Sequence, residues 1–354
     1  MKKNPSGKRG LDPTSPSKIL LLRLRRIGDI ILTTPAVAAL KKAFPLASLT
    51  YVVEEPYLRL VEGNPALDKI IAVKPKPSAR DSWRLIRQIR KERYDAVLDF
   101  HGGPRTSLWT LLSKAGIKVG YLIRGRGWPY DRAVPRGRLE GPVHSADNHL
   151  NLVKTLGAAV PKKPELFLPP ARPGESARVD RIFKENKLKG VRAVVLHIGA
   201  GNAFRDWGLK NLSALAGRLA ALAGVRVVLA GGEADRGREK EMLEAVGLTA
   251  FSLVGRLNLA ELGEVIGRAA LFVGPDSGPM HIAASTSTPI VALFGPTLPG
   301  HFAPRRRQVV LLEKDLDCRP CRQRECRYED FRCLQTISVD EVFKACRPFL
   351  QNRR

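Results

Sequence analysis

Short apolar runs alternate with amphipathic segments along the whole chain. In the first half, runs rich in Val, Ile and Leu are bounded by charged residues, glycine or proline and predict strands. These runs lie at residues 18–22, 49–53, 69–73 and 94–100. Apolar side chains at helical spacing predict helices between them, at residues 30–44, 57–61 and 83–92. Regular alternation of strands and helices is typical of a parallel, doubly wound α/β sheet.

The second half repeats this order after a proline-rich stretch at residues 161–173, which we interpret as a linker. The pattern predicts strands at residues 191–198, 225–230, 250–254, 271–273 and 290–294. It predicts helices at residues 176–187, 211–223, 236–245 and 259–267. The chain therefore contains two Rossmann-like halves.

Composition narrows the class of protein. The 354 residues are 44% apolar, which supports two domains with sizeable cores and argues against disorder. Sixty Lys and Arg against 34 Asp and Glu give a formal charge of +26, so we expect a polyanionic partner. Only 6% of residues are aromatic and no recognition motif appears, so we expect no nucleic acid partner. No apolar run reaches 18 residues, and the sequence predicts a cytoplasmic protein.

The turn GPDSGP follows the apolar run Leu271–Val273 and precedes a short helix. In a parallel sheet such a turn lies at the carboxyl edge, where the N–H groups of Ser277 and Gly278 can point at a phosphate. We expect Asp276 or Ser277 to cap the helix and His281, on its first turn, to donate to the same anion. A purely structural turn remains the alternative.

Two strings carry a resemblance to a known family. VGPDSGPMHIAAS...TPIVALFGPT resembles the donor-nucleotide motif of the heptosyltransferases of lipopolysaccharide synthesis, glycosyltransferase family nine, and RRIGDIILTTPAVAALKKAFP resembles their amino-terminal motif. The resemblance covers about residues 18–350. It implies the GT-B fold, an α/β architecture of two Rossmann-like domains whose parallel sheets face a central cleft.

We expect the chain to be organised around these two domains. Residues 1–17 read as a disordered basic tail, 18–165 as a Rossmann-like acceptor domain and 174–336 as a Rossmann-like nucleotide-sugar domain. Residues 337–354 read as a terminal helix that can pack back on the amino-terminal domain.

Asp29 follows the first strand and therefore lies at the carboxyl edge of the first sheet. A carboxylate there can cap the next helix or take a proton from an acceptor hydroxyl. In the family, the aspartate after the glycine of this motif is the proposed general base. The resemblance thus implies that Asp29 is catalytic.

The resemblance also assigns the donor side. The family has a lysine two residues before a tryptophan; here Arg205 takes that place, and Trp207 is followed by Gly208 instead of the usual proline. Arginine keeps the charge for a diphosphate. Glu233 or Asp235 would bind the ribose, and the alternative for either is that it caps a helix. Leu257 would pack on the adenine, and its alternative is a place in the core. Asp276, Ser277, Gly278 and His281 complete this side, with Asp276 ordering the turn or the sugar.

The excess of basic residues suggests the acceptor. We expect four arginines at strand ends of the first domain, namely Arg25, Arg59, Arg105 and Arg124. They suit the Kdo carboxylates and phosphates of a lipid A-core acceptor, and the alternative is that they are solvated surface charges. The same charge suits the anionic inner-membrane surface, which predicts peripheral binding at its cytoplasmic face. The sequence has no DxD pair, so we expect no obligatory Mg²⁺ and no cofactor.

A cysteine-rich stretch, Cys318-x₂-Cys321-x₄-Cys326-x₆-Cys333, lies near the end of the chain. Four thiols this close can hold Zn²⁺ or an iron–sulfur cluster, remain reduced, or form disulfides. The spacing matches no standard zinc module, and we assign no metal site. A similar stretch occurs in many family members, and this tail favours those that add the second heptose.

The sequence as a whole predicts an inverting transferase that moves L-glycero-D-manno-heptose from ADP-heptose to the lipopolysaccharide inner core. One alternative is a related GT-B transferase that uses another nucleotide sugar. A second is a non-catalytic basic protein that binds polyanions. A dinucleotide oxidoreductase is disfavoured, because Gly28 stands alone where G-x-G-x-x-G would be needed.

Overall fold

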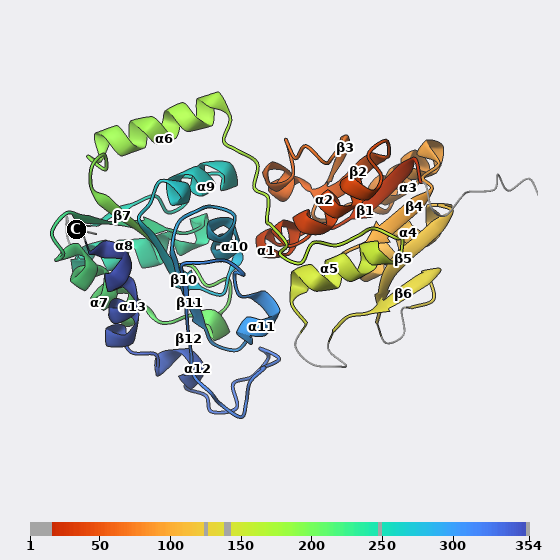
Figure 1. Cartoon of the computed structure of the whole chain (residues 1–354). Coiled ribbons are helices and arrows are strands. Elements are labelled where there is room, and N and C mark those ends of the chain that lie inside the picture. The colour runs from red at the N-terminus through yellow and green to blue at the C-terminus, as the bar shows by residue number, and fades with distance from the viewer. Residues whose placement is uncertain (1–15, 124–126, 138–142, 247–249, 352–354) are drawn as a thin grey trace, which may run out of the picture. The chain divides into compact units, whose positions relative to one another are not determined.

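The computed structural model describes residues 16–123, 127–137, 143–246 and 250–351 of the chain (Figure 1). These form two compact units that divide between Phe167 and Leu168, inside the proline-rich stretch. Of the tail predicted to be disordered, only Pro16 and Ser17 are described, and Ser17 donates two hydrogen bonds to the Asp95 carboxylate, at 2.7 and 2.8 Å.

The first unit is built on one six-stranded parallel sheet with the order β3-β2-β1-β4-β5-β6. Its strands are β1 (Lys18–Leu22), β2 (Ser48–Glu54), β3 (Lys69–Val73), β4 (Ala96–Asp99), β5 (Ile117–Leu122) and β6 (Arg132–Pro135). The connecting helices are α1 (Ile27–Ile31), α2 (Thr34–Ala43), η1 (Glu55–Leu60), α3 (Ala79–Glu92), α4 (Pro104–Leu112) and α5 (Ser145–Lys154). Parallel strands need such crossovers, and both faces of the sheet are therefore covered.

The second unit repeats this architecture with the order β12-β11-β10-β7-β8-β9. Its strands are β7 (Arg192–His197), β8 (Val225–Ala230), β9 (Ala250–Ser252), β10 (Leu271–Pro275), β11 (Ile290–Phe294) and β12 (Val309–Glu313). Its helices are α6 (Pro173–Glu185), η2 (Ala203–Arg205), α7 (Leu209–Ala220), η3 (Glu233–Asp235), α8 (Arg236–Val246), α9 (Leu259–Gly267), α10 (Gly278–Ala284), α11 (Pro299–Phe302), α12 (Arg332–Gln335) and α13 (Val339–Leu350).

The terminal helix α13 belongs to the core of the second unit. Ser338 begins it with a capping box, in which the Ser338 hydroxyl accepts from Glu341 N and the Glu341 carboxylate accepts from Ser338 N. Its apolar face, with Val342, Cys346 and Leu350, packs with residues of α7, β10 and β11. Its buried face is therefore part of the core of the second unit.

Both sheets share one topological feature that positions the functional side chains. In each, the strand order reverses between the first and fourth strands of the unit, which are β1 and β4 in one and β7 and β10 in the other. In open parallel sheets, ligands bind outside the carboxyl ends of the strands at this switch point. Asp29 follows β1, and Arg205 and Asp276 follow β7 and β10, so the sequence-predicted residues fall at these two points.

Helix length bears on the membrane question. No helix among the described residues is long and apolar enough to cross a lipid bilayer.

Candidate active site

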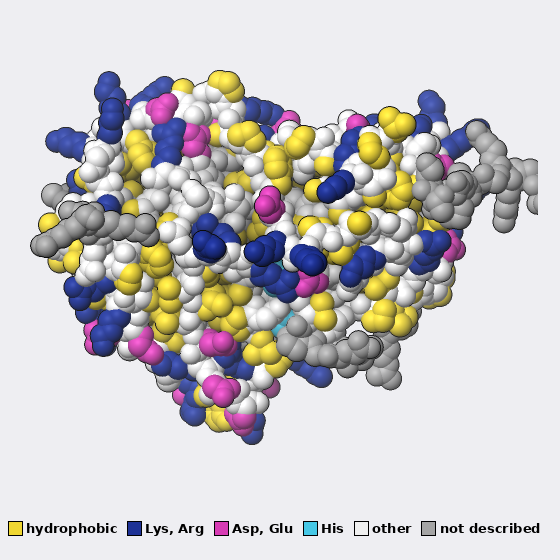
Figure 2. Space-filling view, viewed as in Figure 1, with side chains coloured by type: hydrophobic (Ala, Val, Ile, Leu, Met, Phe, Trp, Pro, Cys, Tyr) yellow, Lys and Arg dark blue, Asp and Glu magenta, His cyan; other side chains and the backbone are white. Residues whose placement is uncertain are grey.

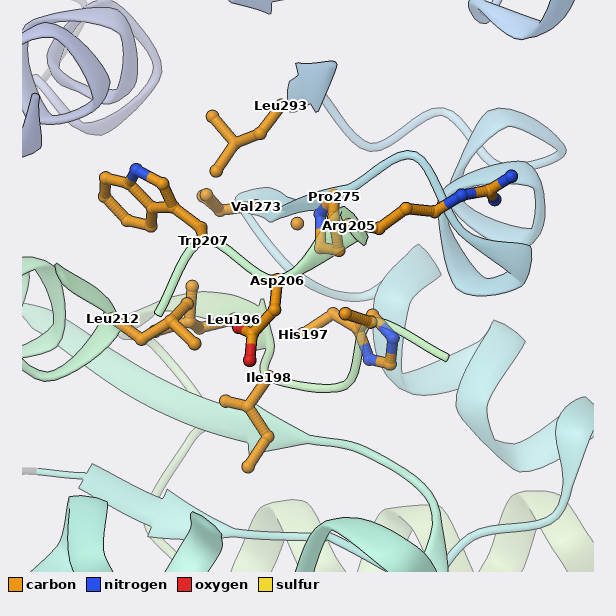
Figure 3. Close-up of a pocket in the computed structure, with 12 residues that line it drawn as sticks. Leu196, His197, Ile198, Arg205, Asp206, Trp207, Leu212, Val273, Pro275 and Leu293 are labelled. Carbon is orange, nitrogen blue, oxygen red and sulfur yellow. The ribbon is translucent and has the colours of Figure 1, made fainter. Parts of the chain in front are cut away.

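Arg205 lies at the end of η2, in the loop that follows β7. Its Nη1 donates to the main-chain oxygen of Asp276 at 3.0 Å, and its Nε donates to Gln323 Oε1 at 3.2 Å. The pocket beside this loop is lined mainly by apolar side chains, and Figure 3 shows Arg205 extending away from them, in the opposite direction from Trp207. The guanidinium is therefore held in place while its charge faces outward from the core.

Asp276 organises the turn after β10. Its carboxylate is buried, accepts a 2.5 Å hydrogen bond from the Thr297 hydroxyl, and lies 3.8 Å from Arg205 Nη1. Its main-chain N–H donates to Leu293 O of β11 at 3.0 Å. These contacts agree with a residue that orders the turn rather than one that exchanges protons.

The helix α10 begins directly after this turn, with Ser277 as its N-cap residue. Neither expected cap is made, because the Ser277 side chain forms no capping hydrogen bond and the Asp276 carboxylate is bound by Thr297. The Ser277 hydroxyl is buried and has no hydrogen-bond partner among the residues described. His281 is buried on the same short helix, so Ser277, Gly278 and His281 are grouped beside Asp276.

Trp207 anchors the loop that carries Arg205. Its indole is 2% exposed and donates to Ile337 O at 2.8 Å, which ties the loop to the segment before α13. The next residue, Gly208, has φ +90. Proline is locked near −65° and cannot adopt this conformation, which explains why glycine replaces the family's usual proline here.

Glu233 and Asp235 have different surroundings at the carboxyl end of β8. Asp235 Oδ2 accepts from Gly232 N at 2.8 Å and is packed against Gly199 and Gly231, so this carboxylate holds the turn. The Glu233 side chain is 72% exposed and pairs with Arg236. Glu233 is thus the carboxylate that a ligand can reach. Leu257, after β9, is half-buried.

These residues follow the order of the strands along one edge of the sheet. The sequence β10, β7, β8, β9 places Asp276 to His281, then Arg205, then Glu233, then Leu257. Neighbouring strands are about 4.8 Å apart, so three spacings span roughly 14 Å. An extended ligand with an anionic group at one end and an apolar group at the other would fit this order.

In the first unit, Asp29 forms an ion pair with Arg23. The distance from Arg23 Nη2 to Asp29 Oδ2 is 2.6 Å, and Arg23 Nη1 donates to Phe100 O at 2.8 Å. Asp29 lies inside the first turn of α1, not on the turn before it, and Arg26 takes the N-cap position with φ 71. Because its carboxylate is bound to Arg23, the side chain is fixed and 23% exposed.

His101 follows β4, across the switch point from Asp29. Burial, together with the charges of Arg23 and Arg25, lowers the pKa of His101 to about 3, with Asp29 opposing the shift. The ring is therefore neutral at physiological pH, and its Nδ1 is buried without a hydrogen-bond partner in the described part of the chain. The buried Asp99 carboxylate accepts from the N–H groups of His101 and Gly102, at 3.0 and 2.8 Å, and fixes this loop.

The arginines assigned to the acceptor differ in availability. Arg25 is exposed, whereas Arg59 pairs with Glu62 at 3.3 Å. Arg105 pairs with the buried Glu54, donates to Pro75 O at 2.9 Å and stacks on Trp109, with 5.3 Å from Cζ to the ring centroid. Arg124 lies outside the described residues. Carboxylate partners reduce the charge that Arg59 and Arg105 offer to an anion.

Sequence reasoning missed one basic residue at this edge. Arg136, just after β6, lies over the Tyr121 ring with 4.9 Å from Cζ to the centroid. The sequence pattern did not predict β6, and a residue can be placed at the carboxyl edge of a sheet only when the strand before it is recognised. Lys and Arg outnumber acidic side chains across the face shown in Figure 2, as the net charge of +26 requires.

The four clustered cysteines line one hollow of about 190 Å³ in the second unit. They are free thiols, as is Cys346. In the part of the chain that the structure describes, no three His, Cys, Asp or Glu side chains are arranged to hold a metal ion. The stretch nevertheless adjoins Arg205, through Gln323.

Two Rossmann-like units, with a fixed carboxylate at one switch point and a fixed arginine at the other, define a GT-B glycosyltransferase. Residues 82–332 match the model of glycosyltransferase family 9 (heptosyltransferase), and the chain belongs to this family.

Known relatives agree with this assignment. Lipopolysaccharide heptosyltransferase 3 of Escherichia coli is 28% identical over 293 residues, 77% of this chain and 82% of that protein. Lipopolysaccharide heptosyltransferase 1 of Pseudomonas aeruginosa is 27% identical over 328 residues, 88% of each chain. The solved structure of ADP-heptose LPS heptosyltransferase II of E. coli has a TM-score of 0.78 at 20% identity, covering 94% of this chain and 98% of that one. The predicted family, the GT-B fold and the assignment as a glycosyltransferase are confirmed, and these relatives are heptosyltransferases of lipopolysaccharide.

The low pKa of His101 has a consequence for stability. An unfolded histidine titrates near pH 6.5 and folded His101 near 3, so between these values the unfolded state binds more protons and stability falls as the pH is lowered. We expect His101→Gln to lose less stability than the wild type between pH 6.5 and 4. Urea midpoints measured across this range check it. Parallel profiles for the two proteins would show that His101 does not contribute.

Proposed function

We propose that this enzyme transfers L-glycero-D-manno-heptose, with inversion, from ADP-heptose to the Kdo or heptose residues of the lipopolysaccharide inner core. The observation that carries the proposal is the order of side chains along the carboxyl edge of the second sheet, which matches an extended nucleoside diphosphate. The names of the relatives specify heptosyl transfer, and that of the E. coli structural neighbour specifies ADP-heptose.

The donor would lie along this edge with its diphosphate at the switch point. Arg205 supplies positive charge to the diphosphate, and the N–H groups of Ser277 and Gly278, the Ser277 hydroxyl and His281 supply hydrogen bonds. Asp276 holds the turn through its carboxylate and holds Arg205 through its main-chain oxygen. Glu233 binds the ribose hydroxyls, and Leu257 packs against the adenine.

The reaction needs one proton acceptor and one stabilised leaving group. The acceptor hydroxyl oxygen attacks the anomeric carbon of heptose, its proton passes to Asp29, and the bond from that carbon to the diphosphate oxygen breaks. ADP leaves with its new negative charge next to Arg205. The ion pair with Arg23 orients Asp29, and we invoke neither a cofactor nor a metal ion.

The acceptor is a strongly anionic glycolipid. Arg25, with Arg59 and Arg105, would bind its Kdo carboxylates and lipid A phosphates at the carboxyl edge of the first sheet. Arg124, which lies outside the described residues, belongs to this set by the sequence prediction alone. Arg136 extends this basic set. Because Arg59 and Arg105 carry carboxylate partners, we expect Arg25 to contribute more to acceptor affinity than either of them.

We further propose that the enzyme binds the cytoplasmic face of the inner membrane. The support is the net charge of +26 together with exposed apolar side chains: Trp128 is 72% exposed, and Leu108 and Leu122 about half. Two contacts connect the segments that carry these side chains. Gly127, next to Trp128, contacts the Leu122 side chain, and Ser107, next to Leu108, has its hydroxyl 2.8 Å from Tyr130 OH. Tryptophan and basic residues are the side chains that favour a membrane interface.

Replacing Asp29 by Asn tests the base. We expect kcat for transfer to heptose-deficient lipopolysaccharide to fall by about 10²- to 10⁴-fold, because the amide cannot take the proton. ADP affinity should stay unchanged, whereas the melting temperature should fall, because the buried Arg23 loses its charged partner. Asp131→Asn is the matched control, since Asp131 precedes β6 and lies at the opposite edge of the same sheet. Equal rates for Asp29→Asn and Asp131→Asn would eliminate Asp29 as the base.

Nucleotide binding by calorimetry tests the donor. We expect ADP to bind more tightly than UDP or GDP without added metal. Removing a charged hydrogen-bond donor costs about 1.5–3 kcal/mol, so Arg205→Ala should weaken ADP binding about 10- to 100-fold. Arg218→Ala serves as the control, because Arg218 lies in the last turn of α7, where it pairs with Asp340 and does not contact Arg205. Preference for UDP would instead favour a related transferase, and no nucleotide binding would favour a polyanion-binding protein.

Vesicle sedimentation tests the membrane surface. Vesicles containing anionic lipid should bind the protein, and raising salt should release it. Trp128→Ala should lower binding several-fold, whereas Leu46→Ala, fully exposed before β2, should leave it unchanged. If both variants bind like the wild type, Trp128 is not part of the membrane surface.

A further inference from the structure

Gln323 connects the cysteine-rich stretch to the arginine of the candidate donor site. Its Oε1 accepts one hydrogen bond from Arg205 Nε at 3.2 Å and another from Asn202 Nδ2 at 3.0 Å. An amide oxygen has two lone pairs, and both are used here. A single oxygen therefore joins the Asn202 and Arg205 side chains of the loop that follows β7.

The guanidinium of Arg205 is held on two sides. Nε donates to Gln323 Oε1 at 3.2 Å, and Nη1 donates to the Asp276 main-chain oxygen at 3.0 Å. Within the residues that the structure describes, Nη2 makes no hydrogen bond. Because guanidinium is planar and rigid, fixing two of its nitrogens fixes the direction of the third. That nitrogen is left for a ligand oxygen.

The position of Gln323 is itself well determined. Its backbone is in the left-handed region, with φ 56, a conformation that a non-glycine residue keeps only where its surroundings hold it. Its N–H donates to Cys321 Sγ at 3.3 Å, and Cys321 N donates to Pro296 O at 2.8 Å, directly after β11. Arg319 strengthens the anchor by donating to Thr297 O at 2.9 Å and pairing with Glu313 at 2.8 Å. The turn thus holds the amide in place from the strands of the same sheet.

The chemistry of the side chain matters as much as its position. A carboxylate here would also accept from Nε, but it would neutralise Arg205 and repel a diphosphate. A neutral amide orients the guanidinium and adds no further negative charge to that of the Asp276 carboxylate, which lies 3.8 Å from Nη1. This combination is suited to a cation that has to bind an anionic leaving group.

We propose that Gln323 is a positioning residue for donor binding, which orients Arg205 so that Nη2 meets a diphosphate oxygen. The inference rests on the proposed role of Arg205. It gives the cysteine-rich stretch a function in the reaction: the stretch presents Gln323 to the loop after β7.

The test is a double-mutant cycle in the full chain, read as ADP affinity by calorimetry. The substitution removes a hydrogen bond from Arg205 and leaves every contact to the ligand in place, so we expect Gln323→Ala to weaken ADP binding only about 3- to 10-fold. In the Arg205→Ala background the same substitution should have no further effect, because Gln323 acts through Arg205. Gln335→Ala is the matched control: Gln335 also contacts this loop, donating to Asp206 O at 3.3 Å, but does not contact Arg205.

The outcomes separate this inference from the proposed function. If Arg205→Ala weakens ADP binding but Gln323→Ala does not, the positioning role is overturned and the donor site stands. If the losses from the two substitutions add, Gln323 acts independently of Arg205 and the inference also fails. If Arg205→Ala leaves ADP affinity unchanged, both the donor contact and the inference fall. Melting temperatures of all variants show whether a loss of affinity reflects unfolding.

Discussion

The reversal of strand order in each sheet is the constraint on which the rest of the structure depends. Because β1 pairs with β2 on one side and β4 on the other, the loops leaving β1 and β4 diverge and open a space above the carboxyl edge. The same holds for β7 between β8 and β10. Apolar strands and right-handed crossovers are sufficient to produce this arrangement. Asp29 and Arg205 then lie in the first helical elements after β1 and β7.

Arginine–carboxylate contacts define the local geometry at both switch points. A buried charge is tolerated only when it is paired and hydrogen-bonded, and Arg23 meets this condition through Asp29 and Phe100 O. Arg205 is similarly restrained, but by a neutral amide and a main-chain oxygen. The first arrangement fixes a carboxylate by a direct ion pair, while the second fixes a cation whose paired carboxylate, Asp276, lies 3.8 Å from Nη1. The contrast matches the different chemical tasks proposed for the two units.

The sequence was sufficient to predict both Rossmann-like sheets and the strand ends that carry Asp29, Arg205 and Asp276, since these follow from local apolar runs and glycine-rich turns. It missed β5, β6 and β12. In β5, Lys118 and Gly120 interrupt the apolar run, and β6 and β12 are edge strands with half-exposed side chains. Contacts between distant residues were also out of reach. Gln323 and Arg205 are 118 positions apart, and nothing in either local sequence specifies their hydrogen bond. The wrong assignment of a cap at Asp276 has the same origin, because Thr297 takes its carboxylate.

The distribution of the four tryptophans gives the protein a built-in optical reporter. Trp83, Trp109 and Trp128 lie in the first unit, and Trp207 is the single tryptophan of the sequence after residue 168. Its indole is enclosed, hydrogen-bonded to the segment before α13, and two residues from Arg205. A chain with phenylalanine at the other three positions would therefore emit tryptophan fluorescence from the loop after β7 alone. The wavelength and intensity of that emission would follow the packing of this loop on the terminal helix, separately from events in the first unit.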